Sequence, residues 1–181
     1  MKEISLNLLD IAQNSVSAGA TLIELTVRES QAEDIVLMSV ADNGKGMSPE
    51  FLARVTDPFT TTRTTRPVGM GLPLLKMEAE MTGGGLEIKS ELGRGTTVTA
   101  TFRRSHIDTP PLGDLKGTVV TLIQGSPDIN FVYRRETDHG QFVLSTEEMR
   151  EELGGIPLDE PEVLAWIGEY IEENEQSLQG E

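Results

Sequence analysis

Apolar and polar positions along the first half of the chain follow two different periods. Apolar residues at helical spacing predict a helix over residues 4–18. Alternating, branched residues then predict two strands, over residues 21–29 and 34–42. The glycine-broken segment DNGKGMSPE that follows predicts a loop, and its Ser48-Pro49 pair can start a short helix.

The regular spacing of apolar residues is lost after the short helix and returns in the second half of this region. Residues 55–70 show no period and are rich in threonine, which predicts a long loop of the kind that often carries function. The segment GLPLLKMEAEMTGGG predicts a helix that is entered from a Gly-Met-Gly turn and ended by three glycines. Residues 86–102 predict a two-stranded hairpin with Gly93 and Gly95 in its turn.

The sequence changes character after this hairpin. Residues 103–114 read as a proline-marked linker, residues 115–125 predict a short helix, and residues 129–145 predict a hairpin before two acidic helices. The order of elements predicts an α+β fold, a two-layer sandwich of helices on one mixed, mostly antiparallel sheet. We divide the chain into a domain over residues 1–103 and a C-terminal α/β extension over residues 104–181.

Composition excludes several classes of function. The net charge is −15, and residues 147–181 hold twelve acidic residues against one basic residue, Arg150. Such a surface repels a phosphate backbone, so we expect no nucleic-acid binding, and a phosphorylated ligand needs a local, geometrically defined site. The chain has no apolar run that could span a bilayer or serve as a signal peptide. We therefore expect no membrane insertion and a cytoplasmic protein.

The first stretch with candidate chemistry is the pair Asp10 and Asn14, which lie one helical turn apart. At that spacing both side chains can meet a common ligand. Asn14 offers a neutral oxygen to a magnesium ion that phosphates and water also ligate. Asp10 would then take a proton from an attacking water, which makes it the candidate catalytic residue.

The second stretch, DNGKGM, begins with Asp42 at the end of a predicted strand. A carboxylate in this place can accept a hydrogen bond from the amino group of adenine. Gly44 and Gly46 would let the backbone close around a flat ring.

The third stretch, VGMGL, opens a predicted helix. A glycine pair at a helix N-terminus predicts an anion site, because free N–H groups and the helix dipole meet phosphates there. The residues that would serve are Gly69, Met70, Gly71 and Leu72.

Taken in order, these stretches resemble the motifs of one ATP-binding superfamily. LLDIAQNSVSAGAT, residues 8–21, is similar to the N-box of mismatch-repair ATPases. DNGKGM resembles the G1 box, and DPFTTTR, residues 57–63, resembles the phenylalanine-containing segment before the ATP lid of histidine kinases. Residues 69–102 resemble the histidine-kinase G2 box and its closing strands, with Thr96 matching the threonine that supports the adenine-binding aspartate.

Over about residues 1–103, the chain is identified as a member of the GHKL superfamily of gyrase, the ninety-kilodalton heat-shock chaperones, histidine kinases and MutL-type ATPases. The resemblance implies a Bergerat-type fold and the binding of ATP with Mg²⁺. It adds Met47 of the G1 box to the nucleotide contacts. Arg63 and Arg66 of the lid either clamp phosphate oxygens or contact a partner protein.

Three positions leave alternatives open. Position 10 carries Asp where the hydrolysing branches have Glu and histidine kinases often have Asn, so hydrolysis through Asp10 stays open. Lys45 either reaches the phosphates or is a solvated loop residue. His106 faintly resembles a phosphoacceptor histidine, but the prolines that follow it forbid a continuing helix.

Three functions fit these features. The first is a stand-alone kinase module that delivers phosphate from Mg-ATP to a histidine or serine of a partner in signal transduction, since the sequence begins at the N-box helix without a phosphoacceptor hairpin. The second is a slow ATPase with Asp10 as base, and the third is a non-enzymatic, nucleotide-responsive adaptor. We place the kinase first. We expect a protein partner to bind through residues 104–181 and leave the formation of a homo-oligomer open.

The acidic C-terminal helix allows two interpretations. Its segment EVLAWIGEYIEEN carries a wide apolar stripe formed by Val163, Leu164, Trp166, Ile167, Tyr170 and Ile171. The stripe either docks against the protein's own core or binds a partner. In the second case Trp166 would be the anchor.

Overall fold

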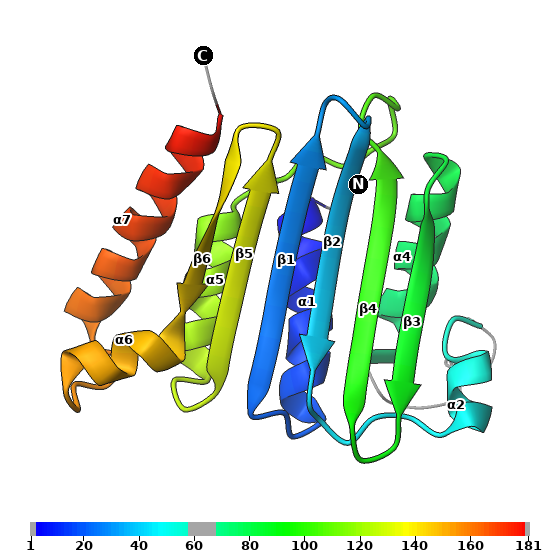
Figure 1. The fold of residues 1–181 in the computed structure, drawn as a ribbon. Helices are drawn as coiled ribbons and strands as arrows, with labels where there is room; N and C mark the ends of the chain where they lie inside the picture. Colours follow the sequence, from blue (N-terminus) through cyan, green and yellow to red (C-terminus); the bar gives the residue numbers. More distant parts are fainter. Residues whose placement is uncertain (1–2, 58–67, 180–181) are drawn as a thin grey trace.

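The structure, a computed structural model, describes residues 3–57 and 68–179 of the 181-residue chain (Figure 1). Within these ranges the helices are α1 (Ile4–Ser17), α2 (Pro49–Arg54), α4 (Val68–Met81), α5 (Leu115–Gly125), α6 (Thr146–Leu153) and α7 (Pro161–Leu178). The strands are β1 (Leu22–Ser30), β2 (Ile35–Asp42), β3 (Gly85–Glu91), β4 (Gly95–Arg103), β5 (Asn130–Thr137) and β6 (Gly140–Ser145). Each helix and strand that the sequence pattern predicts is present, and only boundaries differ.

One sheet runs through both halves of the chain, in the order β3-β4-β2-β1-β5-β6. β1 and β5 are parallel, with Leu22 opposite Asn130, and every other neighbouring pair is antiparallel. The predicted mixed, mostly antiparallel sheet is therefore confirmed. Because β5 pairs directly with β1, residues 130–145 continue the sheet that the first four strands begin.

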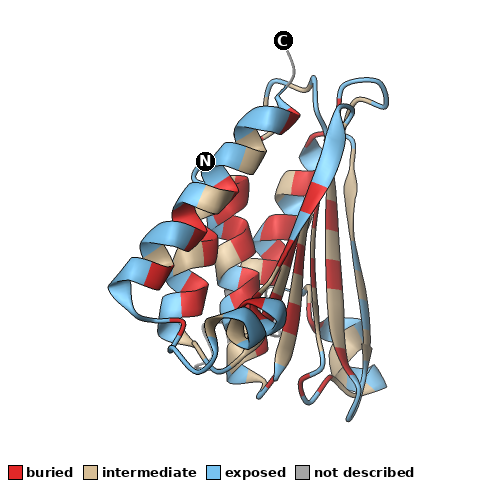
Figure 2. Cartoon of the chain, turned by 60° about the vertical axis from the view of Figure 1, so that its left-hand side comes forward, coloured by how far each residue is buried: buried red, intermediate tan, exposed pale blue. Residues whose placement is uncertain are grey.

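The helices form a second layer on one face of this sheet. α4, α1 and α5 lie behind the strands in Figure 1, and α7 stands at the β6 edge. Side chains of β1 alternate between the two faces, and Ile23, Leu25 and Val27 are buried under the helices. Figure 2 shows that buried positions of strands and helices gather where the two layers face each other. On the opposite face polar pairs occur, such as Arg134, whose Nη1 donates to Glu24 Oε1 at 2.8 Å.

The linker after β4 returns to the start of α1. The amide of Ile4 donates to the carbonyl of Pro111 at 2.8 Å, and the amide of Ser5 donates to that of Leu112 at 2.9 Å. These bonds satisfy two of the N–H groups that a helix start leaves without partners. The Thr118 hydroxyl of α5 donates to the Ser5 carbonyl at 3.0 Å. α1 is thus held firmly at its N-terminal end.

A buried polar cluster ties α7 to β5. Glu175 accepts hydrogen bonds from the Tyr133 hydroxyl at 2.8 Å and from Nε of Arg135 at 3.1 Å. Arg135 is fully buried and also contacts Glu29 of β1, with its Nη2 at 3.4 Å from Oε1. Burial, together with the negative charge of Glu175, raises the pKa of Tyr133 above its ordinary value. The phenol therefore stays protonated and remains a donor.

The apolar stripe of α7 is divided between the core and the surface. Val163, Ile167 and Ile171 are buried against the rest of the protein, while Trp166 is exposed. Docking against the protein's own core therefore accounts for part of the stripe and leaves Trp166 outside it. Among the described residues, no helix combines the length and the apolar character that crossing a bilayer requires.

One helix begins earlier than the sequence pattern predicts. The expected loop extends to residue 70, whereas α4 begins at Val68. Glycine costs a helix about 1 kcal/mol relative to alanine, and the burial of Leu72 and Leu75 on α4 offsets this cost. The prediction of a loop is therefore wrong for residues 68–70, and its part over residues 58–67 lies outside the described residues.

Candidate nucleotide-binding site

α1 carries Asp10 and Asn14 on the side that faces α4. Asn7 of α1 donates its side-chain amide to Glu78 Oε1 of α4 at 3.3 Å. Asn14 follows Asn7 by about two helical turns, so its side chain leaves α1 in nearly the same direction. Asn14 is half-buried there, and Asp10 is exposed. The two predicted residues therefore share one side of the helix, as their spacing requires.

Asp42 ends β2 with both carboxylate oxygens engaged. The hydroxyl of buried Ser15, on α1, donates to Oδ2 at 2.6 Å. The amides of Gly44 and Thr96 donate to Oδ1, at 2.8 Å and 3.3 Å. Three segments of the chain thus fix the orientation of this carboxylate, while Oδ2 keeps capacity to accept a further hydrogen bond.

Thr96 lies directly opposite Asp42 in the register of β2 and β4. Its contact with Asp42 comes from the backbone amide, because its hydroxyl instead meets Ser90 Oγ at 2.8 Å. Ser90 Oγ also accepts the amide of Met47 at 2.8 Å. The loop after β2 is therefore fastened to β3 and β4 through one serine side chain.

Sequence reasoning missed three of the residues that build this site. Ser15 and Ser90 are hydroxyl residues at inward-facing positions, and a polar residue at an apolar position of a periodic pattern is the signal that could have found Ser15. Asn43 was also missed. Its Oδ1 accepts the amides of Thr21 at 2.8 Å and Leu22 at 3.0 Å, which joins the DNGKGM segment to the start of β1.

The two glycines of the DNGKGM segment are required by the protein's own packing. Gly46 has a φ of +73°, and a Cβ there would lie 2.1 Å from the carbonyl oxygen of Glu91. A Cβ on Gly44 would lie 2.9 Å from the Cβ of Ala18. A side chain at either position would push the loop away from β3 or α1. The glycines therefore have a structural reason besides the approach to a flat ring that the sequence predicts.

The first turn of α4 contains Gly69, Met70 and Gly71. The first amides of a helix have no carbonyl four residues earlier within that helix, so they are suited to donate to an anion. Leu72 is buried and holds this end of the helix on the core. Outside the described residues lie Arg63, Arg66 and the side chain of Met70.

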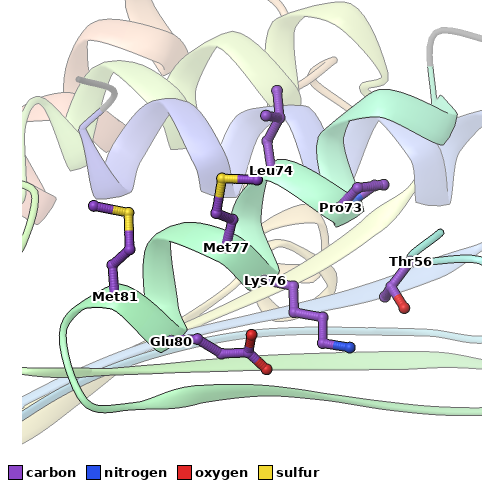
Figure 3. A pocket seen from close by; sticks show the side chains of 7 residues that line it. All are labelled: Thr56, Pro73, Leu74, Lys76, Met77, Glu80 and Met81. Carbon is purple, nitrogen blue, oxygen red and sulfur yellow. The ribbon is translucent and has the colours of Figure 1, made fainter. Parts of the chain in front are cut away.

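A cavity of about 530 Å³ lies elsewhere, on the outer side of α4 (Figure 3). Its lining consists of Thr56, Pro73, Leu74, Lys76, Met77, Glu80 and Met81. Neither Asp42 nor Asn14 belongs to this lining, so the cavity is distinct from the predicted nucleotide site.

Two further candidates occupy turns. Lys45 is exposed, and its backbone amide donates to the Ala18 carbonyl at 3.0 Å. The ring Nδ1 of His106 accepts the amide of Asp108 at 3.0 Å. His106 thus stabilises its own turn after β4.

Comparison with known proteins identifies the family. A family model described as "Histidine kinase-, DNA gyrase B-, and HSP90-like ATPase" matches residues 1–106, more than half of the chain. The chain belongs to this ATPase family. Residues 1–106, from α1 to the turn after β4, are therefore an ATP-binding, histidine kinase-like domain, and the resemblance based on the N-box, G1 and G2 segments is confirmed.

Two relatives of this ATPase domain are much longer proteins. The chain is 37% identical over 114 residues to "Non-motile and phage-resistance protein" of Caulobacter vibrioides, which covers 60% of this chain and 14% of that protein. It is 38% identical over 102 residues to "Sensor protein SrrB" of Staphylococcus aureus, which covers 54% of this chain and 17% of that protein. The similarity thus concerns a small part of each relative.

One solved structure shares the fold of the ATPase domain and of part of the segment that follows it. "Crystal Structure of N terminal domain of a DNA repair protein" superposes with a TM-score of 0.51 at 16% identity, over 80% of this chain and 53% of that one. This share exceeds the part covered by residues 1–106. The likeness in fold therefore extends into the segment that follows the family match.

Proposed function

We propose that this chain is a Mg-ATP-binding kinase module that transfers phosphate to a histidine or serine of a partner protein. Membership of the histidine kinase-like ATPase family supports the nucleotide and the chemistry. The relative named as a sensor protein supports a role in signalling. The observation that carries the proposal is the carboxylate of Asp42, held at the end of β2 by three donors.

Asp42 fits the amino group of an adenine ring. Its Oδ1 already accepts two amides, whereas Oδ2 accepts the single hydroxyl of Ser15 and has room for one more donor. A carboxylate in a fixed orientation attracts an amino group and repels a carbonyl oxygen. We therefore expect the site to accept adenine and to reject guanine, which presents a carbonyl at the corresponding ring position.

Asn14 and the first turn of α4 fit the phosphates and their metal. The side-chain oxygen of Asn14 is a neutral ligand of the kind that magnesium accepts. The amides in the first turn of α4 are donors suited to phosphate oxygens. ATP supplies the phosphate that is transferred. The proposed nucleotide-binding residues are Asn14, Asp42, Gly44, Gly46, Met47, Arg63, Arg66, Gly69, Met70, Gly71, Leu72 and Thr96.

Residues 104–181 are the proposed partner-binding part, beside a nucleotide-binding domain over residues 1–103. They add α5, β5, β6, α6 and α7 at the β1 side of the sheet, whereas β3 and β4 lie on the other side of β2. A partner bound there would leave the end of β2 and the start of α4 accessible to nucleotide.

A second candidate function, slow hydrolysis of ATP, depends on Asp10. Its exposed carboxylate lies one helical turn before the proposed magnesium ligand Asn14 and on the same side of α1. Water can reach an exposed carboxylate, which suits a general base. Hydrolysis and transfer to a partner would share the nucleotide site and differ in the group that attacks the phosphate.

The nucleotide proposal is tested by titrating ATP into the purified chain with magnesium. We expect Asp42→Ala and the isosteric Asp42→Asn to weaken binding by about a hundredfold or more, because the carboxylate acceptor is lost. Asp159→Ala, at an exposed position between α6 and α7, is the control for the loss of one negative charge. Normal ATP binding by folded Asp42→Asn would overturn the assigned role of Asp42.

The chemistry is tested with ATP labelled at the γ-phosphate. Label transferred to a co-purifying protein supports the kinase, and label released as free phosphate supports the hydrolase. Label that stays in intact, bound ATP in the presence of a binding partner would contradict both and favour a nucleotide-responsive adaptor.

A further inference from the structure

Trp166 of α7 is an exposed aromatic residue that is held in place. Its ring stacks on that of Tyr170, with centroids 5.5 Å apart and planes 20° from parallel. Even so, 51% of Trp166 remains accessible to solvent. Large aromatic side chains contribute much of the free energy of binding at protein interfaces. An accessible tryptophan that is already ordered is therefore suited to bind another molecule.

A row of aromatic contacts connects Trp166 to the core. Tyr170 meets Phe142 of β6 edge-to-face at 6.3 Å between centroids, and Phe142 meets Tyr133 of β5 in the same manner at 5.8 Å. Tyr133 is fully buried and donates to Glu175. Because Tyr170 is fixed by this row, Trp166 loses little conformational entropy on binding a partner.

The exposed side of α7 around Trp166 is acidic. Glu162, Glu169 and Glu173 recur with Trp166 at spacings of three, four and seven residues, which places them on neighbouring rows of the helix surface. All three are exposed. Figure 2 shows pale blue, exposed positions along the outer side of α7. Within the described part of the chain, no ion pair joins any of the three to a cation.

Two neighbouring acidic residues of α7, unlike these three, form ion pairs within the protein. Glu172 lies 3.3 Å from Nζ of Lys116, and Glu175 lies 3.1 Å from Nε of Arg135. The carboxylates beside Trp166 are therefore the ones that remain available to an external cation. We call Glu162, Trp166, Glu169, Tyr170 and Glu173 the α7 face.

We infer that the α7 face binds a basic segment of a partner protein, with an arginine stacked on the exposed side of Trp166. A guanidinium is planar, binds aromatic faces by cation–π attraction, and pairs with carboxylates. The α7 face supplies both kinds of contact. This inference deepens the proposed function, since it rests on the proposal that the chain acts on a partner protein through residues 104–181.

Charge argues against the other occupants of such a face. A second copy of this chain would bring the same acidic residues and a net charge of −15. Pairing the face with itself would therefore set carboxylates against carboxylates. A nucleic acid or an anionic membrane is repelled for the same reason.

The test uses the full chain and a fluorescein-labelled synthetic peptide with three arginines at one-turn spacing on an alanine background. Fluorescence anisotropy measures its binding, and a peptide with lysines in place of the arginines is the comparison. We expect the arginine peptide to bind more tightly, and Trp166→Ala to weaken it about tenfold. Leu92→Ala, at a residue of the β3–β4 turn that is 61% exposed, is the matched control and should bind like the parent.

Several results would overturn the inference. Equal binding of the two peptides with no effect of Trp166→Ala would indicate only non-specific attraction to an acidic protein. No binding at low salt would exclude a basic partner at this face. A dimer that sedimentation detects in the parent and not in Trp166→Ala would assign the face to a second copy. ATP titration of the same samples keeps this test separate from the proposed function, since Trp166→Ala should bind ATP normally.

Discussion

The hydroxyl of Ser15 donates to Oδ2 of Asp42 at 2.6 Å and joins the middle of the site to α1. Ser15 directly follows Asn14, the proposed magnesium ligand. One turn of α1 therefore contacts the carboxylate proposed to recognise the base and carries the amide proposed to ligate the metal. Because a helix turn is rigid, the two contacts are held at a fixed spacing that suits a nucleotide.

Removing this hydroxyl should weaken nucleotide binding without unfolding the protein. A hydrogen bond to a charged acceptor contributes roughly 1.5–3 kcal/mol, so we expect Ser15→Ala to lower the affinity for ATP about tenfold or more. Isothermal titration measures the change. Ser17→Ala, exposed at the end of the same helix, should leave affinity unaltered. Equal affinity in both variants would mean that Gly44 and Thr96 suffice to orient Asp42.

Asp10 can be tested separately from ATP binding. If its carboxylate is the general base, Asp10→Asn should reduce phosphate release at least about a hundredfold and leave the affinity for ATP unchanged. A steady-state assay measures the rate of phosphate release, and an equilibrium titration measures the affinity for ATP. Gln13→Ala, exposed on the same helix, is the control. Unchanged release in Asp10→Asn would remove the base role from Asp10.

The buried cluster at α7 makes a prediction about stability. Glu175→Gln removes one of the two carboxylates that pair with fully buried Arg135, so we expect the free energy of unfolding to fall by about 3 kcal/mol. Glu172→Gln, also on α7, breaks an exposed pair with Lys116 of α5 and should cost less than about 1 kcal/mol. Urea titration compares the variants. If both variants lost a similar free energy of unfolding, the burial of Arg135 would not determine how much its ion pair contributes to stability.

Acid should weaken the contact between two hairpin turns. Asp138 accepts the Ser30 hydroxyl and the amides of Ala32 and Gln31, and these bonds hold its pKa below the ordinary value of 3.8. A carboxyl whose folded-state pKa is lowered stabilises the fold above its unfolded pKa. Its contribution is lost as the pH falls through the folded value. The free energy of unfolding should therefore decline below about pH 4.

The variant Asp138→Asn isolates this contribution. It should be less stable than the parent near neutral pH and should lose less stability between about pH 5 and pH 2. Asp159→Asn, in the α6–α7 loop, controls for the removal of one negative charge. Urea unfolding at a series of pH values gives the free energy of unfolding as a function of pH for the parent and for Asp138→Asn. Parallel curves for the parent and Asp138→Asn would contradict the assigned role.

Local signals explain what could be predicted in advance. The period of the apolar residues determined α1 and the paired strands β1 and β2, because each period is set by neighbours within one element. Glycine and proline marked the turns for the same reason. The order of the N-box, G1 and G2 segments determined the family, since these motifs are contiguous stretches of sequence.

Contacts between distant segments decided the rest. Ser15 and Asp42 are 27 residues apart, so no local pattern links them. The parallel pairing of β1 with β5 depends on how α5 crosses the sheet. No local sequence pattern between the two strands indicates this pairing. The stripe on α7 was too wide to bury entirely, and packing on the core enclosed Ile167 while Trp166 stayed outside. The sequence by itself therefore determined the elements and the family, whereas only tertiary packing decided which side chains meet, because that depends on segments brought together by the folded sheet.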